Sequence, residues 1–233
     1  MNYTTLYNTI QTYTENQFPD VYLASGSTVS ATTQINMFIT QAEQRIYNSV
    51  QFPSIRKNVT GQTTLGNKYL TCPDDFLAVY SMAVIDAAGA YEYLLNKDVN
   101  FIRQAYPTPT DTATPKYYAL FGPTVSSGNI TNELSFILGP TPDISYEVEL
   151  HYYYYPESIT TVASGQTWLG DNFDTVLLYG SLVEAYTFMK GEADIILGYD
   201  AKYKEALALA KRLGDGMERQ DAYRSGQFRQ AVT

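Results

Sequence analysis

The residue types that most often perform chemistry are scarce in this sequence. Its 233 residues include one histidine, His151, and one cysteine, Cys72. A serine or cysteine nucleophile needs a base beside it, usually a histidine, and His151 lies within a run of tyrosines, where a structural role is favoured. Cys72 stands before Pro73, and we interpret it as a buried or half-buried thiol rather than a nucleophile. One cysteine and one histidine are also too few for a zinc site.

The acidic residues offer one pair that could do chemistry. Glu147 and Glu149 would point to the same side of a strand, as the two carboxylates of a glycosidase can. Neighbouring acids on one strand face are more often a solvated surface. Scattered acids elsewhere lack the spacing of a calcium loop, and Gly61 and Gly66 do not lead into a helix as a phosphate-binding loop would. We therefore predict that the protein is not an enzyme and holds no metal or cofactor.

The composition favours a protein that packs against neighbouring chains. Apolar residues make up 45% of the sequence, as in globular proteins, while charged residues make up only 17% and tyrosines number 22. Tyrosine combines a large apolar ring with a polar tip, which suits half-buried sheet faces and subunit interfaces. The net charge is −9 and no cluster of Lys and Arg occurs, which argues against sequence-general DNA binding.

No segment of the sequence has the character of a membrane span or a targeting signal. No apolar run approaches the ~20 residues needed to cross a bilayer, and the first residues lack the basic start and apolar stretch of a secretion signal. A single cysteine cannot form an intrachain disulfide. We expect synthesis in the cytoplasm and no association with a membrane.

Two helices are predicted in the first 56 residues. The first has apolar residues at helical spacing, namely Tyr3, Leu6, Tyr7, Ile10 and Tyr13. The second follows Ser30 and keeps one continuous apolar face, made of Ile35, Phe38, Ile39, Ala42, Ile46 and Val50. Polar residues such as Glu43 and Arg45 are placed mostly outside that face. Ser30 or Thr32 can cap the start of this helix, and Pro53 lies just beyond its end.

The middle of the chain changes to the period of a strand. Gly66-Asn67 between residues 60–65 and 68–71 predicts a tight hairpin. Further strands are predicted over residues 76–85, 91–95, 116–121 and 133–138. Asp98 can cap a short helix over residues 99–105. The clearest strand covers residues 146–155, where apolar residues alternate with a side of acids and tyrosines that should face water or a neighbouring subunit.

Helical patterns return in the last third of the chain. Residues 171–190 are apolar nearly all round, which predicts a buried central helix. A last helix is predicted over residues 194–213, and Gly214 and Gly216 would end it. Beyond them, residues 217–233 are polar and have too few apolar side chains to fold alone.

Together these elements predict an α+β fold, in which N- and C-terminal helix pairs form a helical bundle with an inserted, mainly antiparallel β domain. The two helix pairs must bury their apolar faces, and packing against each other is the simplest arrangement. The expected domains are a bundle of residues 1–56 plus 165–214, a β-sheet domain of residues 57–164, and an extended C-terminal arm of residues 215–233.

A series of segments resembles the head-to-tail adaptor proteins of tailed bacteriophages, also called connector or tail tubular proteins, and especially those of short-tailed phages. The segments are Ala42–Tyr47, Tyr69–Leu77, Tyr91–Leu95, Trp168–Gly170 and Glu184–Tyr186. The most distinctive is Tyr69–Leu77, with the pattern Tyr-Leu-x-x-Pro-x-Asp-Phe-Leu, which is a strand-and-turn pattern rather than a chemical one. The resemblance extends over nearly the whole chain.

The resemblance implies a structural virion protein in the neck, between capsid and tail. Such proteins form a ring, typically of twelve copies, between the portal protein and the tail tube or nozzle, and double-stranded DNA passes through without specific binding. The bundle would form the body of the ring, and the C-terminal arm would reach the portal. The expected portal-contacting residues of the arm are Arg219, Tyr223, Arg224, Phe228 and Arg229. A frayed, solvated terminus is the alternative for this segment.

Two other classes of function stay open. A carbohydrate- or receptor-binding module of a phage tail would also use tyrosines on a sheet, but it has less need of flanking helices and a basic, aromatic arm. A wall-degrading hydrolase would need catalytic groups that the sequence hardly supplies. Binding to portal, binding to glycans and turnover of a substrate would separate the three classes.

Overall fold

A computed structural model of the protein describes residues 1–224, apart from residues 109, 127, 128 and 133. The chain divides into two compact units: Met1–Ile55 with Tyr155–Thr233, called here the helical unit, and Arg56–Tyr154, called here the sheet unit. Helices and antiparallel sheets both occur, so the predicted α+β class is confirmed.

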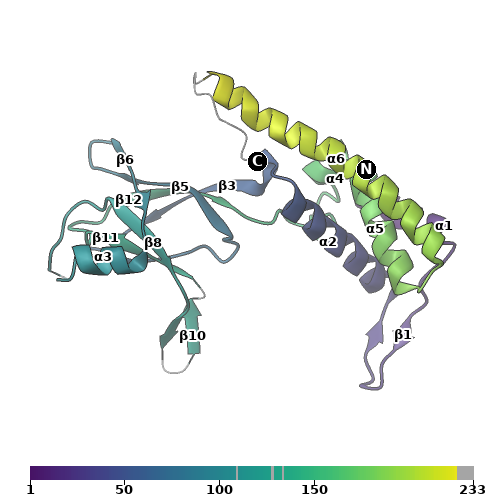
Figure 1. Ribbon diagram of the computed structural model, residues 1–233. Helices are drawn as coiled ribbons and strands as arrows, with labels where there is room; N and C mark the ends of the chain where they lie inside the picture. Colours follow the sequence, from purple (N-terminus) through teal and green to yellow (C-terminus); the bar gives the residue numbers. More distant parts are fainter. Residues whose placement is uncertain (109, 127–128, 133, 225–233) are drawn as a thin grey trace. The chain divides into compact units, whose positions relative to one another are not determined.

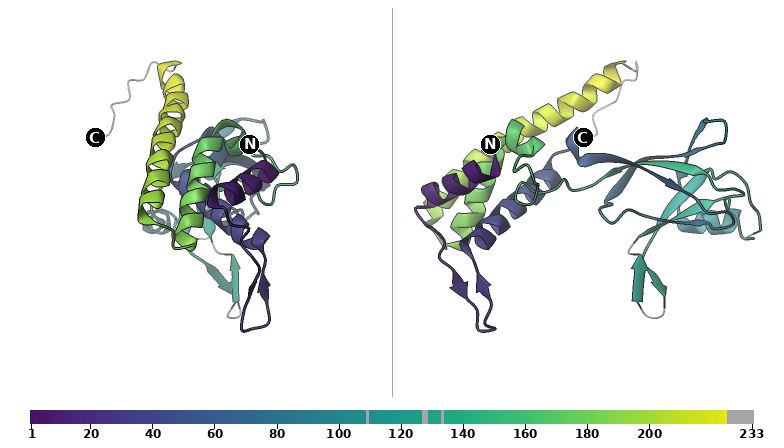
Figure 2. Two further views of the ribbon diagram at one scale, coloured as in Figure 1. Left: turned by 90° about the vertical axis from the view of Figure 1, so that its right-hand side faces the viewer. Right: turned by 180° about the vertical axis from the view of Figure 1, so that it is seen from behind.

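The helical unit is built around a central helix, α5. Its elements in chain order are α1 (Tyr3–Thr14), β1 (Val21–Tyr22), β2 (Thr28–Val29), α2 (Ala31–Ser49), a 3-10 turn (Pro53–Ile55), α4 (Trp168–Asn172), α5 (Asp174–Phe188) and α6 (Ala193–Arg224). α5 packs against α1, α2, α4 and α6 (Figure 1), and α1 and α6 lie on different sides of it (Figure 2). Gly180 permits this packing, because a Cβ there would come within 3.2 Å of both Ala42 Cβ and Tyr203 Cε2.

α2 confirms the helix predicted after Ser30. Ser30 Oγ accepts a hydrogen bond from Thr33 N at 3.2 Å, which is the expected N-cap. The predicted apolar face is buried along its whole length. The placement of Glu43 mostly outside that face is wrong, since its side chain is 2% exposed. It is buried because its carboxylate binds the backbone of Ile159.

α6 is longer than predicted. The helix continues through Gly214 and Gly216 to Arg224, so the prediction that these glycines end it, with an extended arm from residue 215, is wrong up to residue 224. A Cβ on Gly214 would lie 2.9 Å from Gln51 O and 3.2 Å from Val50 Cγ1. Glycine serves close packing against the end of α2 here, rather than the left-handed turn of a helix cap.

The sheet unit contains two four-stranded sheets, with strand orders β3-β12-β5-β6 and β4-β11-β8-β7. The strands are β3 (Arg56–Gln62), β4 (Tyr69–Thr71), β5 (Ala78–Ile85), β6 (Tyr91–Tyr93), β7 (Leu95–Asn96), β8 (Tyr117–Phe121), β11 (Ser135–Gly139) and β12 (Glu147–Tyr153). A small hairpin, β9 (Thr124–Ser126) with β10 (Asn129–Asn132), and a helix, α3 (Val99–Ala105), complete the unit. Asp98 caps α3 as predicted.

The core of the sheet unit lies between the two sheets. Val84 and Leu150 of the first sheet belong to the same buried cluster as Phe136 and Leu138 of the second. The opposite face of the second sheet packs against Ile102 of α3. Side chains on both faces of the second sheet are therefore buried, whereas the first sheet keeps one face largely open to solvent.

The tight hairpin predicted at Gly66-Asn67 is wrong. β3 pairs with β12 and β4 pairs with β11, so the segments on either side of the turn belong to different sheets. The turn itself is present: Gly66 has the positive φ of 72° that favours glycine, and Asn67 N donates to Thr64 O at 3.0 Å. The local sequence specifies a turn, while distant strands decide which partners its flanks find.

Candidate functional site

Two residues of the sheet unit that could do chemistry, Glu149 and His151, lie on the outward side of β12. The apolar residues of β12 are buried and Glu149 and His151 are half-exposed, as the predicted alternation requires. His151 Nε2 lies 3.2 Å from Glu149 Oε1, and that oxygen also accepts a hydrogen bond from Asn58 Nδ2 at 2.9 Å. These contacts link β12 to β3 across an open sheet face. They give the histidine an acidic partner but, among its described contacts, no hydroxyl or thiol nucleophile.

The cysteine is buried in the core of the sheet unit. Cys72 is 7% exposed and belongs to the same buried cluster as Phe76 and Phe136. Burial raises the pKa of its thiol to about 12, so the thiol keeps its proton near neutral pH and no thiolate is available to attack a substrate. The prediction of a buried structural thiol is confirmed.

Neither a metal cluster nor a membrane helix is found in the part of the chain that the structure describes. No group of three or more His, Cys, Asp or Glu among those residues is placed to hold a metal ion. No helix there is long and apolar enough to cross a bilayer. What the described residues offer is exposed aromatic and apolar surface.

Exposed tyrosines gather on the open face of the sheet β3-β12-β5-β6. Tyr91 and Tyr93, on the edge strand β6, are 51% and 66% exposed, and their rings stack with centroids 6.4 Å apart. The Arg56 guanidinium lies 4.4 Å from the centroid of the Tyr80 ring and 5.6 Å from that of Tyr153. Such cation–π contacts hold aromatic rings in defined positions at a surface. Rings of this kind are typical anchors of protein interfaces.

A hairpin that the sequence did not predict projects from the helical unit (Figure 1). Its base is fixed by Gln34 of α2, which is 4% exposed. The Gln34 Nε2 donates to Pro19 O at 3.1 Å and to Val29 O at 3.4 Å, one on each leg of the hairpin. On the first leg, Asp20 Oδ1 accepts a hydrogen bond from the α2 backbone, at Ala31 N. A buried amide therefore sets the direction in which the hairpin points.

The outer part of this hairpin is uncovered. Val21, Tyr22 and Leu23 are 44%, 80% and 47% exposed, and residues 21–42 contain no charged side chain. Strands of two residues are too short to produce a strand period, so no periodic signal marks them in the sequence. The turn at Gly26, with φ of 81°, is the one local indication that was present.

A buried carboxyl group ties α2 to the segment of residues 155–167 that precedes α4. Glu43 Oε1 accepts a hydrogen bond from Ile159 N at 3.0 Å, while Oε2 has no hydrogen-bond partner among the described residues. Burial raises the pKa of this carboxyl above its ordinary value, opposed by the hydrogen bonds from Ile159 and Ser158. The sequence reading missed this residue because a single acid does not disturb an apolar period.

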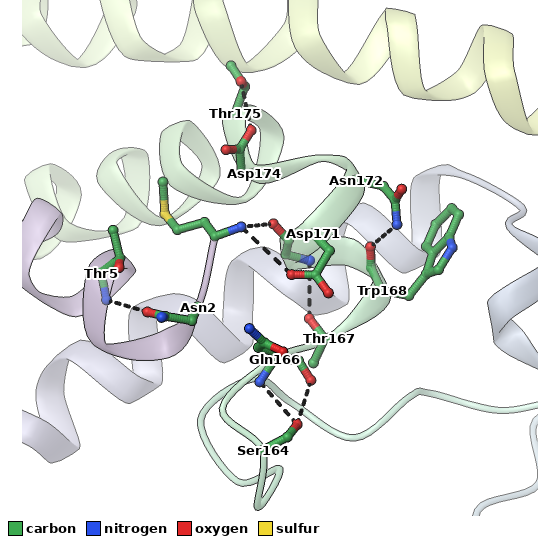
Figure 3. Close-up of polar contacts among 12 residues, drawn as sticks. Asn2, Thr5, Ser164, Gln166, Thr167, Trp168, Asp171, Asn172, Asp174 and Thr175 are labelled. Atoms are coloured by element: carbon green, nitrogen blue, oxygen red, sulfur yellow. Dashed lines mark hydrogen bonds and ion pairs between the residues drawn. The ribbon is translucent and has the colours of Figure 1, made fainter.

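The end of the same segment is held by the N-terminus of the chain and by α4 (Figure 3). Thr167 Oγ1 accepts from Gly170 N at 3.1 Å and so caps α4. The Met1 amino group donates to Gly170 O and lies 3.9 Å from Asp171 Oδ1. A Cβ on Gly170 would lie 2.7 Å from Met1 O, so glycine is needed for this approach. The segment between β12 and α4 is therefore fixed within the helical unit at both Glu43 and α4.

The predicted arm residues fall into two groups. Arg219, Tyr223 and Arg224 lie in the last turns of α6. Phe228 and Arg229 lie outside the described residues. Their contact with a portal stays a prediction.

Comparison with known proteins gives one family. The model of the family described as SU10 adaptor protein matches residues 1–231. The match includes both the helical unit and the sheet unit, so neither unit carries it alone. Among curated proteins, no match is found.

Proposed function

This chain belongs to the SU10 adaptor protein family, a family of phage adaptors, and we propose on that basis that it is a head-to-tail adaptor of the virion neck. Copies of the protein form a ring between the portal protein and the tail tube or nozzle, and double-stranded DNA passes through the ring. The role is structural and involves no catalysis, cofactor or metal. The family match along residues 1–231 is the observation that carries the proposal.

The described surface supports a structural role. The histidine sits in a solvated polar network with Glu149, and the thiol of Cys72 is buried and protonated. Exposed rings such as Tyr91 and Tyr93 and the uncovered hairpin at Tyr22 are features of binding surfaces. A net charge of −9 suits a ring through which DNA must slide without adhering.

In this proposal the helical unit forms the body of the ring, and the C-terminal end of the chain contacts the portal. The end of α6 and the residues after it contain the predicted anchors, among them Arg219 and Tyr223. Arginine can bind carboxylates through two parallel hydrogen bonds, and aromatic rings can fill pockets between portal subunits. The first part of this C-terminal segment, up to Arg224, is helical rather than extended. A helix advances about 1.5 Å per residue, so this part reaches less far than an extended chain would.

Phage particles that lack the adaptor provide the direct experiment. DNA-filled heads from an infection without the adaptor gene should leak DNA and fail to accept tails, and the purified protein should restore both properties. Electron microscopy of the restored particles should show added density between portal and tail. Heads that accept tails equally well with and without the protein would contradict the proposal.

The second candidate is a carbohydrate- or receptor-binding module of a phage tail. The stacked, exposed rings of Tyr91 and Tyr93 favour it, because sugar rings bind to exposed aromatic faces. A glycan array or binding to host cell envelopes would test it, with a variant carrying Tyr91→Ser and Tyr93→Ser as the control. Retention of glycans by the protein but not by this variant would support the module over the adaptor.

A further inference from the structure

Most described cations of the helical unit lie in α6. Residues 1–44 and 155–189 contain no Lys or Arg, and their exposed acids are Glu15, Asp20, Glu157, Asp171 and Asp174. Between its start and residue 214, α6 has four exposed cations, namely Lys202, Lys204, Lys211 and Arg212, and three acids, namely Asp194, Asp200 and Glu205. Asp200 pairs with Lys204 at 2.6 Å. In a chain with a net charge of −9, this helix provides most of the described cations of its unit.

The acids next to the hairpin and most of α6 lie on different sides of α5, although the end of α1 comes close to the start of α6, where the Tyr13 and Tyr199 ring centroids are 6.5 Å apart. α1 lies on the other side of α5 from α6 (Figure 2). α1 ends next to Glu15, and the chain then leads to Asp20 at the base of the hairpin. The hairpin with Glu15 and Asp20 is called here the hairpin surface. The exposed part of α6 between residues 197 and 213 is called here the α6 surface.

Each of these surfaces also has uncovered apolar side chains. Tyr22 on the hairpin surface is 80% exposed, and Leu209 and Leu213 on the α6 surface are 60% and 46% exposed. Leu209 and Leu213 are one helical turn apart, and Arg212, three positions after Leu209, is a neighbour of Leu209 on the helix surface. Both surfaces have exposed apolar side chains. The α6 surface has four cations and two acids, Asp200 and Glu205, and so is net positive, whereas the hairpin surface has only the acids Glu15 and Asp20.

We propose that the hairpin surface of one copy binds the α6 surface of the adjacent copy. This inference rests on the proposed ring, and it names the surfaces that would hold the ring together. A contact between two different surfaces repeats around a rotation axis and closes into a ring when the rotation permits. One subunit therefore has to present both halves of the contact, on different sides, as the helical unit does.

Charge complementarity identifies a second copy of the chain as the occupant. The hairpin surface has two acids and no cation, so DNA and acidic proteins are poor partners for it. The chain itself supplies the cationic, leucine-bearing surface that fits. Gln34 holds the hairpin in one direction in the single chain, so little ordering is needed when a neighbour binds.

Two double variants test the surfaces separately. The first, Tyr22→Ser with Leu23→Ser, removes the apolar part of the hairpin surface and leaves its base at Gln34 intact. The second, Lys211→Glu with Arg212→Glu, reverses the charge of the α6 surface. The matched control is Lys97→Glu with Lys116→Glu, which makes the same charge change at exposed positions of the sheet unit. Circular dichroism and thermal melts verify that all of them fold.

The measurement is binding of purified protein to adaptor-free heads that carry portal, followed as copies bound against concentration. Wild-type protein and the control should bind in a steep, cooperative isotherm, because bound neighbours contact each other. Each surface variant should bind without cooperativity and at least tenfold more weakly. An equal mixture of the two variants should recover part of the cooperativity, because alternating copies restore one intact contact in every two.

The outcomes separate this inference from the proposed function. If wild type binds and both surface variants bind with the same cooperativity, the surfaces do not meet and the adaptor role stands. A mixture that binds no better than either variant would likewise show that the two surfaces are not partners. If the variants lose affinity while cooperativity is unchanged, the surfaces contact portal instead and the inference is overturned. If wild-type protein does not bind portal-bearing heads, the proposed function falls and this inference with it.

Discussion

Replacing Gly214 by alanine tests whether α6 packs closely against the end of α2. The new Cβ would lie 2.9 Å from Gln51 O and 3.2 Å from Val50 Cγ1. Gln51 O is a backbone atom, so either α6 or the chain after α2 must move. Overpacking of this kind costs ~1–3 kcal/mol. Because removing a glycine from a helix interior gains about 1 kcal/mol, the net effect should be a loss of ~0–2 kcal/mol in the free energy of unfolding.

Gly198 in the same helix provides a matched control. It is exposed, and a Cβ there would meet no atom within 4 Å. Gly198→Ala should therefore gain about 1 kcal/mol from helix propensity alone. The changes in the free energy of unfolding caused by the two substitutions are thus expected to differ by ~1–3 kcal/mol, with Gly214→Ala the less stable variant.

Urea denaturation followed by tryptophan fluorescence measures this difference. Trp168 is the single tryptophan of the chain, and its ring lies 5.0 Å from that of Phe52, next to the segment that Gly214 contacts. The fluorescence transition therefore reports on the helical unit. If Gly214→Ala stabilises the protein as much as Gly198→Ala does, the close approach of α6 to Gln51 is refuted, and so is the reason given for the glycine.

Four further results are expected. Because burial raises the pKa of Glu43 on folding, the protein loses stability as the pH rises from the pKa of the unfolded chain through the raised pKa of the folded one. Glu43→Gln should remove this loss, so urea titrations should favour the variant more at neutral than at acidic pH. Parallel pH profiles of the two proteins would contradict this. Cys72, with a pKa of about 12, should react with a thiol reagent only on unfolding, and rapid labelling of the native protein would refute its burial. Deleting residues 217–233 should leave the melting temperature nearly unchanged and abolish stable attachment to portal-bearing heads; unfolding of the truncated protein, or its normal attachment, would disprove the arm. Without portal, sedimentation at micromolar concentration should show mainly monomer, and a stable ring would show that no template is needed.

Elements specified by neighbouring residues could be predicted from the sequence. α2 begins at its Ser30 cap and buries the face that its apolar spacing indicates, and α3 begins at Asp98. The alternation along β12 also follows from its sequence. The pairing of β3 and β4 could not be predicted, because the turn at Gly66 fixes a local backbone conformation and leaves the choice of sheet to residues more than sixty positions away.

The end of α6 shows how one residue type can serve two purposes. Glycine after an apolar period usually caps a helix, because it adopts the left-handed conformation easily. At Gly214 it instead removes a side chain where α6 meets Gln51 O, and the helix continues. Sequence alone cannot separate these uses, since the deciding atoms belong to a segment more than 160 residues earlier in the chain.

Two polar residues of α2, Gln34 and Glu43, are buried and hold segments outside the helix. Gln34 and Glu43 are 4% and 2% exposed, and neither adds apolar contact to the core. A buried polar group costs free energy unless it is hydrogen-bonded, so each of these side chains needs the partners that it binds. Gln34 instead binds both legs of the hairpin, and Glu43 binds the segment before α4. The gain at each position is the placement of a segment outside α2, and at Gln34 that segment is the hairpin, for which a contact between copies is proposed.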